Sequence, residues 1–162
     1  MSSVDTKSKI TPKKLATHLG RIVYGERPSE IINTIRPFKA VSNLVGEERL
    51  LDELAWLLYF AVDAGVIAGL LEHREREVVR QAFFETLRTK ISSTFVNTLK
   101  MRILEYQKAI KSAPEDRCCV GWRFVEFCGL GENAAVALAG TLLFSSTAKQ
   151  ARELVEKYRL AS

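Results

Sequence analysis

The sequence has few of the residues that most often bind metal ions or act as nucleophiles. It contains two histidines and three cysteines. No glutamate stands three positions before His18 or His73, so the motif Glu-x-x-His is absent. The motif H-E-x-x-H is absent as well. These absences exclude the sequence signatures of di-iron helical bundles and of zinc peptidases. A Walker A motif is also lacking, so no nucleoside triphosphate site is indicated.

The three cysteines match neither a disulfide framework nor a common zinc motif. Cys118 and Cys119 are adjacent, and adjacent cysteines rarely bridge each other without strain. The spacing C-C-x8-C lacks the C-x2-C pair of most zinc sites, and both histidines are distant in sequence. Free cysteine is often buried, so we expect Cys118, Cys119 and Cys128 to be small core residues. We predict neither a metal nor a cofactor.

We expect neither a secretory leader nor an interdomain linker. Residues 1–11 are polar and contain lysine, unlike a secretory signal. Hydrophobic residues make up 47% and charged residues 27% of the 162 positions, which is typical of one globular domain. We predict a flexible N-terminal tail over residues 1–10 and a single helical domain over residues 11–162. The free thiols indicate a reducing compartment, the cytoplasm.

Turn-forming residues divide the chain into segments with helical periodicity. Thr11 and Pro12 are typical of a helix start, and Pro37 ends a short isoleucine-rich helix that begins after Pro28. Residues 75–111 repeat apolar side chains about every 3.7 positions, with a bend expected at residues 92–94. Further helices are expected over residues 115–128, 133–144 and 149–160. We therefore predict an all-α fold, a compact single-domain bundle of about six or seven helices.

The longest apolar segment, residues 54–71, predicts a central buried helix. It is apolar on nearly every side except at Asp63. The segment is just long enough to span a membrane, but a central aspartate costs about 2.5–3.5 kcal/mol. This cost roughly cancels the favourable free energy of insertion from the nine large apolar residues of the segment, about 0.3–0.6 kcal/mol each. We therefore expect no membrane span. If Asp63 is buried, it needs a partner, and an arginine among residues 73–90 would supply one.

The same helix carries small residues at every fourth position. Ala61, Gly65 and Gly69 would let another helix approach closely. Such spacing indicates either packing within the protein or an interface between subunits, and both interpretations stay open.

The net charge of +5 at first favours an acidic partner such as nucleic acid. Its distribution weakens that interpretation, because residues 1–40 carry eight basic and three acidic groups, whereas residues 41–72 carry one and six. Blocks of opposite sign can pair with each other within a fold or between subunits. If nucleic acid binds, we expect Lys13, Lys14 and Arg21 of the first helix to contact phosphates.

Taken together, these patterns favour packing over chemistry. We predict a non-catalytic helical interaction or oligomerising module whose partner is another protein or a second copy. The first alternative is a nucleic-acid-binding protein that uses the basic N-terminal segment. The second is an enzyme or carrier with a helix-lined apolar pocket near Asp63 or the cysteines.

Overall fold

The computed structural model describes residues 7–25 and 28–161, and these residues fold mainly into helices. The all-α prediction is thereby confirmed. Eight helices and two three-residue strands occur in the described ranges. In chain order the elements are β1 (Ser8–Ile10), α1 (Pro12–Gly25), α2 (Pro28–Thr34), α3 (Arg36–Val45), α4 (Glu47–Gly69), α5 (His73–Arg88), α6 (Ser93–Ser112), α7 (Cys119–Cys128), α8 (Ala134–Glu156) and β2 (Tyr158–Leu160).

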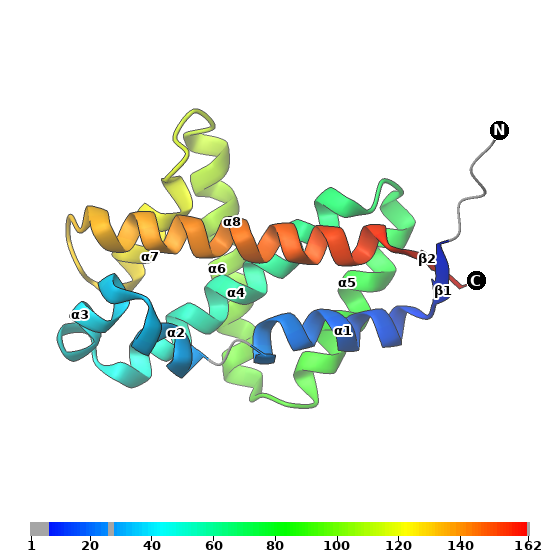
Figure 1. Ribbon diagram of the computed structural model, residues 1–162, viewed down its shortest axis with the longest axis horizontal. Helices are drawn as coiled ribbons and strands as arrows, with labels where there is room; N and C mark the ends of the chain where they lie inside the picture. The colour runs from blue at the N-terminus through cyan, green and yellow to red at the C-terminus, as the bar shows by residue number, and fades with distance from the viewer. Residues whose placement is uncertain (1–6, 26–27, 162) are drawn as a thin grey trace.

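Two long helices, α4 and α8, lie against each other along the long axis of the molecule (Figure 1). Helix α1 packs against α5 at one end, while α7 packs against α8 towards the other end. Helices α2 and α3 pack against each other and against α4. Because α4 has neighbours on most sides, it is buried along its length, as the apolar segment predicts. Nowhere in residues 7–25 and 28–161 is a helix both long and apolar enough to cross a membrane.

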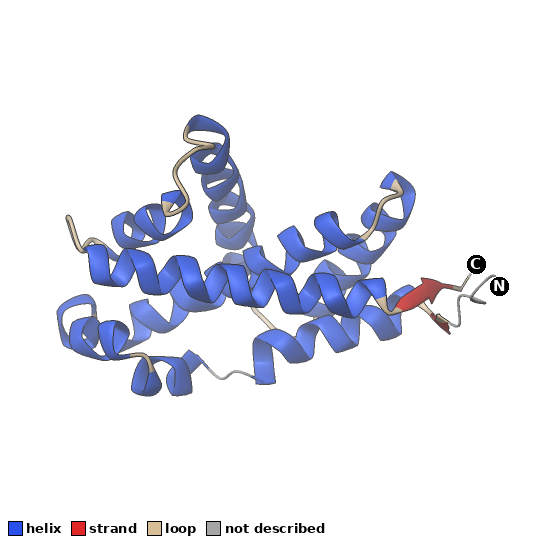
Figure 2. Ribbon diagram, turned by 45° about the horizontal axis from the view of Figure 1, so that its top comes forward, coloured by secondary structure: helices blue, strands red, loops and turns tan. Residues whose placement is uncertain are grey.

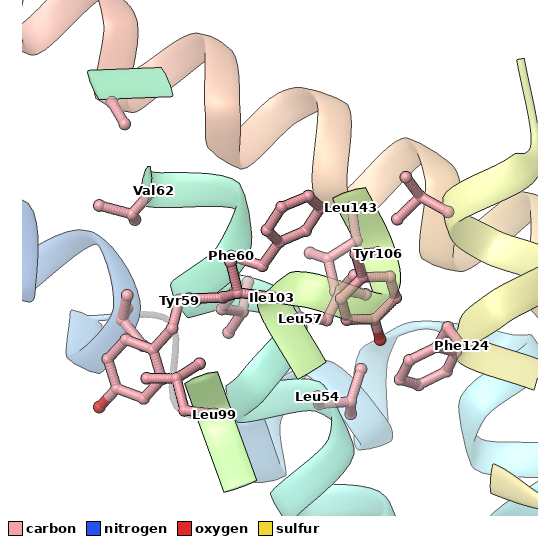
Figure 3. Packing of buried hydrophobic residues seen from close by; sticks show 14 of the residues in the cluster. Leu54, Leu57, Tyr59, Phe60, Val62, Leu99, Ile103, Tyr106, Phe124 and Leu143 are labelled. Atoms are coloured by element: carbon pink, nitrogen blue, oxygen red, sulfur yellow. The ribbon is translucent and has the colours of Figure 1, made fainter. Parts of the chain in front are cut away.

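Stacked aromatic rings join four of the helices in the core. Phe60 of α4 stacks on Tyr106 of α6, with ring centroids 5.0 Å apart (Figure 3). Phe60 also stacks on Phe144 of α8 at 5.1 Å. Tyr106 in turn meets the ring of Phe127 from α7 edge to face at 5.4 Å. Each such pair contributes about 0.5–1.5 kcal/mol beyond the area it buries, so this column fixes how α4, α6, α7 and α8 meet.

The bend expected at residues 92–94 is confirmed, as a break between two helices. Helix α5 ends at Arg88 and α6 begins at Ser93. Ser92 caps the new helix, because its side chain accepts a hydrogen bond from the backbone N–H of Phe95 at 3.2 Å. Low helix propensity and the capping hydroxyl of Ser92 therefore both favour a helix boundary at this position.

The two separate helices expected over residues 133–144 and 149–160 are one continuous helix, so that prediction is wrong. Thr147, expected to cap a new helix, is buried in the middle of α8. The hydroxyl of Ser146 donates back to the carbonyl of Leu143 at 3.1 Å, which is compatible with an unbroken helix. Packing of α8 along α4 outweighs the low propensity of these hydroxyl residues.

One other boundary differs from expectation, and one helix is additional. Helix α7 begins at Cys119 and not near residue 115, because Asp116 accepts a hydrogen bond from the N–H of Cys118 at 2.8 Å and holds a turn. The helix that Pro37 is expected to end, α2, does end before it, at Thr34. The helix that follows, α3, is not among the expected ones, and Pro37 stands in its first turn, where the missing N–H has no cost.

Both ends of the described chain form a small parallel ladder that the sequence pattern does not show. Ser8 lies opposite Tyr158 and Ile10 opposite Leu160. Figure 2 shows the two strands side by side at one end of the molecule. Residues 8–10, which the sequence places in the N-terminal tail, thus belong to the fold, and Ile10 is buried. Three-residue strands are too short to leave a periodic signal.

Candidate functional site

The first half of α8 exposes an uncharged apolar surface. Residues 133–148 contain no charged side chain. Within this stretch Leu138 and Leu142 are 52% and 61% exposed. They line a hollow of about 610 Å³ between α8 and the α2–α3 junction. We call this surface the α8 face; it consists of Ile35, Pro37, Ala135, Leu138, Ala139, Leu142 and Ser146.

Local sequence determines where the α8 face lies. Asn133 begins α8, because its side chain accepts a hydrogen bond from the N–H of Val136 at 3.1 Å. The inner side of the helix packs into the core through residues such as Val136 and Leu143. Since side chains repeat every 3.6 positions, Leu138 and Leu142 then share one outward-facing side. Small residues at 135, 139 and 146 leave the hollow open next to them.

Two exposed apolar residues of α6 are set among charges. Met101 and Leu104 of α6 are 65% and 57% exposed. Exposed Lys100 and Lys108 stand next to them on the same side of that helix. Isolated apolar residues on a charged surface are normal, whereas adjoining exposed apolar residues without charges between them hint at an interface.

Asp63 is buried and paired, as the sequence requires. Its carboxylate accepts two hydrogen bonds from Arg80 of α5, at 2.6 and 3.2 Å. Burial raises the pKa of Asp63, and the hydrogen bonds and charge of Arg80 oppose that rise. Both oxygens face a fixed guanidinium group and the side chain is fully buried. The carboxylate thus holds α4 and α5 together, and no face of it is open to a substrate.

A second buried carboxylate is held in the same way. Glu53, 2% exposed, accepts hydrogen bonds from Arg102 of α6 at 3.0 and 2.5 Å. The guanidinium of Arg102 also lies between two rings, 3.9 Å from the centroid of Phe127 and 5.2 Å from that of Trp56. The sequence does not indicate this pair, because Glu53 stands in the acidic first half of α4, where acidic residues are expected to be exposed. Glu53 stands three positions after Leu50 and one before Leu54, on the apolar side of the helix. This placement is the sequence signal that Glu53 is buried.

Burial raises the thiol pKa of two of the three cysteines. Burial, with Glu53 nearby, raises the pKa of Cys128 to about 12, so its thiol stays protonated near neutral pH. Burial also raises the pKa of Cys119. All three thiols are free, and Cys118 and Cys119 are half-buried. In the described ranges, no three His, Cys, Asp or Glu side chains come close enough together to hold a metal ion.

Ala61, Gly65 and Gly69 face α8 in the structure. A Cβ atom at Gly65 would collide with the carbonyl oxygen of Ala148, and one at Gly69 would collide with the side chain of Val155. Ala61 is fully buried. The space that a partner helix would need on this side of α4 is therefore occupied by α8.

Lys13, Lys14 and Arg21 are exposed on α1. Lys14 and Arg21 are seven positions apart and so lie on one side of the helix, while Lys13 lies about 100° away. Lys13 borders a polar groove between α1 and α5, next to Glu85. The structure thus divides these three residues between two sides of α1, and it places a carboxylate beside one of them.

The α8 face, too, was not predicted from the sequence. Its signal is the long uncharged stretch together with two leucines one helical turn apart. An alanine-rich apolar helix is usually buried, so the pattern alone does not reveal that one side faces solvent. When the chain is compared with protein-family models, with curated proteins and with solved structures, none of them matches.

Proposed function

We propose that this protein is a non-catalytic interaction module that binds a protein partner through the α8 face. The observation that carries the proposal is the pair of leucines, both more than half exposed, beside an apolar hollow in a helix segment without charge. Burying such a surface against a partner contributes about 25 cal/mol per Å² of apolar area. No charged group on this stretch would have to be desolvated when a partner binds.

The buried polar groups support a structural role over a catalytic one. Asp63 and Glu53 are each held by an arginine at hydrogen-bond distance. The Cys128 thiol, with a pKa of about 12, is not a nucleophile near neutral pH. These groups stabilise the bundle and so present the α8 face on a rigid support. The three free thiols support a reducing compartment, and we propose the cytoplasm.

A photo-crosslinking experiment tests this function. A benzophenone amino acid replaces Leu142 in one variant and Leu104 in a matched control; the two leucines are 61% and 57% exposed. Both variants are expressed in cells of the source organism and irradiated. We expect a discrete protein adduct from position 142 and none from position 104. Absence of an adduct at 142, or the same adducts at both positions, would contradict the proposal.

A further inference from the structure

Charged residues of opposite sign border the uncharged stretch of α8. Glu132 precedes it and Lys149 follows it. Both are exposed, and the Lys149 side chain is 75% exposed. Its ammonium group lies 3.8 Å from the carboxylate of Glu153, near the limit of an ion pair, so it remains accessible to another molecule. Lys149 stands seven positions after Leu142, two helical turns, and so lies on the same side of α8.

These residues are arranged symmetrically about the middle of the α8 face. The midpoint between Gly140 and Thr141 is equally far in sequence from Glu132 and Lys149. If a second α8 packed antiparallel across this midpoint, residues at equal distances on either side would meet. Glu132 stands in the turn two positions before α8, so at each end of the helix pair it would lie near Lys149 of the other copy, which gives two identical contacts between opposite charges.

The same alignment matches large residues with small ones. Ala139 and Leu142 are equally far from the midpoint, so each Leu142 would meet Ala139 of the other copy. The hollow beside Ala139 is open to receive a leucine side chain. Ala135 would meet Ser146, and two small residues let the helices approach closely. Antiparallel α8 helices also have opposed dipoles, which is favourable.

From these observations we infer that the α8 face binds a second copy of this chain, forming a two-fold symmetric dimer with antiparallel α8 helices. A symmetric interface must contain both members of every contact on one surface. The α8 face meets that requirement in shape at Leu142, which would enter the hollow beside Ala139 of the other copy, and in charge, with Glu132 just before α8 and Lys149 on it. This inference rests on the proposed function and names its partner.

Sedimentation equilibrium of the full purified chain tests the inference. We expect dimerisation with a dissociation constant in the micromolar range, since one helix pair is small for a stable interface. Glu132→Lys and Lys149→Glu each turn two attractive contacts into repulsive ones, and each should raise the dissociation constant about 3- to 30-fold. The double variant E132K/K149E should regain the wild-type value, because both contacts again join opposite charges.

A mixture makes the test specific for two copies of this chain. When E132K and K149E chains are mixed in equal amounts, every mixed pair joins opposite charges at both contacts. We expect such mixed dimers to form with near wild-type affinity, although each variant alone dimerises weakly. Lys100→Glu and Glu115→Lys, at exposed positions on α6 and after it, are the matched controls. Neither control, alone or mixed, should change the dissociation constant.

Several results would overturn the inference. A strict monomer at high micromolar concentration would do so, and so would a dimer that ignores the charge reversals. The crosslinking experiment keeps this failure separate from failure of the proposed function. A monomer whose position 142 crosslinks to a protein of a different mass overturns the second copy as partner but preserves the interaction module. A monomer without an adduct at 142 overturns both.

Discussion

At the scale of residues, two buried ion pairs determine how α4 meets its neighbours. Asp63 pairs with Arg80 of α5, and Glu53 pairs with Arg102 of α6. Taking a carboxylate out of water costs several kcal/mol, and a paired arginine offsets that cost only with good geometry. Both pairs make two hydrogen bonds, so each stabilises one orientation of a helix against α4.

Substitution of Arg80 should lower the free energy of unfolding more than substitution of its partner Asp63. The Asp63 side chain is fully buried, whereas that of Arg80 is 25% exposed and also contacts Glu77. Arg80→Met leaves a buried charge without a partner and should cost about 3–5 kcal/mol of unfolding free energy. Asp63→Asn leaves an arginine that reaches water, and should cost about 1–2 kcal/mol. Urea denaturation of both variants measures the difference, and equal losses would contradict this asymmetry.

The pH dependence of Arg80→Met follows from the raised pKa of Asp63. Without Arg80, burial acts on Asp63 unopposed and raises its pKa further above the unfolded value. Between those two pKa values the folded form binds a proton that the unfolded form does not, so stability increases as pH falls. The deficit of R80M should therefore shrink between pH 7 and pH 5. The double variant D63N/R80M, which lacks the titrating group, should not show this change.

The sequence predicts one of these ion pairs and not the other. Asp63 stands alone in an apolar segment, so burial and an arginine partner from the next helix follow directly from the cost of a buried charge. Glu53 lies among Glu47, Glu48 and Asp52 in the first half of α4, where acidic residues are normally exposed. Its partner Arg102 is 49 positions away, and only the tertiary fold brings the two together.

At the scale of elements, glycines decide how closely α8 approaches its neighbours. A Cβ atom at Gly121 of α7 would collide with the backbone carbonyl of Ala137 in α8. A backbone atom cannot rotate away, unlike the end of a flexible side chain. Gly140 of α8 is different, because its nearest neighbour would be a ring atom of Phe124 at 3.4 Å, an ordinary contact.

Alanine substitutions at these two glycines should therefore have opposite effects. Gly121→Ala forces α7 and α8 apart, and we expect a loss of at least about 2 kcal/mol in unfolding free energy. Gly140→Ala meets no clash and gains helix propensity, so we expect no loss and up to about 1 kcal/mol of stabilisation. Thermal denaturation followed by circular dichroism compares the two variants. A similar loss in both would mean that close approach of α7 and α8 is not what Gly121 provides.

The elements themselves were predictable where local signals agree with tertiary packing. Ser92 combines low helix propensity with a capping hydroxyl, and the helix breaks there. The serines and threonine at 145–147 show the same local signal, yet α8 continues through them because it packs along α4. No local pattern separates these two cases, since the deciding contacts join residues far apart in sequence. The α8 face was missed for the same reason.

At the scale of the whole molecule, a short ladder joins the two ends of the described chain. Ile10 of β1 is buried, and its carbonyl accepts a hydrogen bond from the N–H of Ala161 at 2.9 Å. Nearby, the rings of His18 and Tyr158 stack at 6.3 Å. The ladder lies at the end of α8 that is remote from the α8 face (Figure 1). Opening the ladder should therefore leave the α8 face unchanged.

This separation can be tested with one substitution at the ladder. Ile10→Asp places a charge where a buried isoleucine stood, and we expect a loss of about 2 kcal/mol, limited because a terminal strand can open locally. Hydrogen exchange at the amide of Ala161 should accelerate strongly, while amides of α4 keep their protection. Ser8→Asp, at an exposed position of the same strand, is the control and should change neither. If Ile10→Asp instead accelerates exchange throughout α4, the ladder is part of the cooperative unit that supports the α8 face. The two ends of α8 would then be coupled through the core.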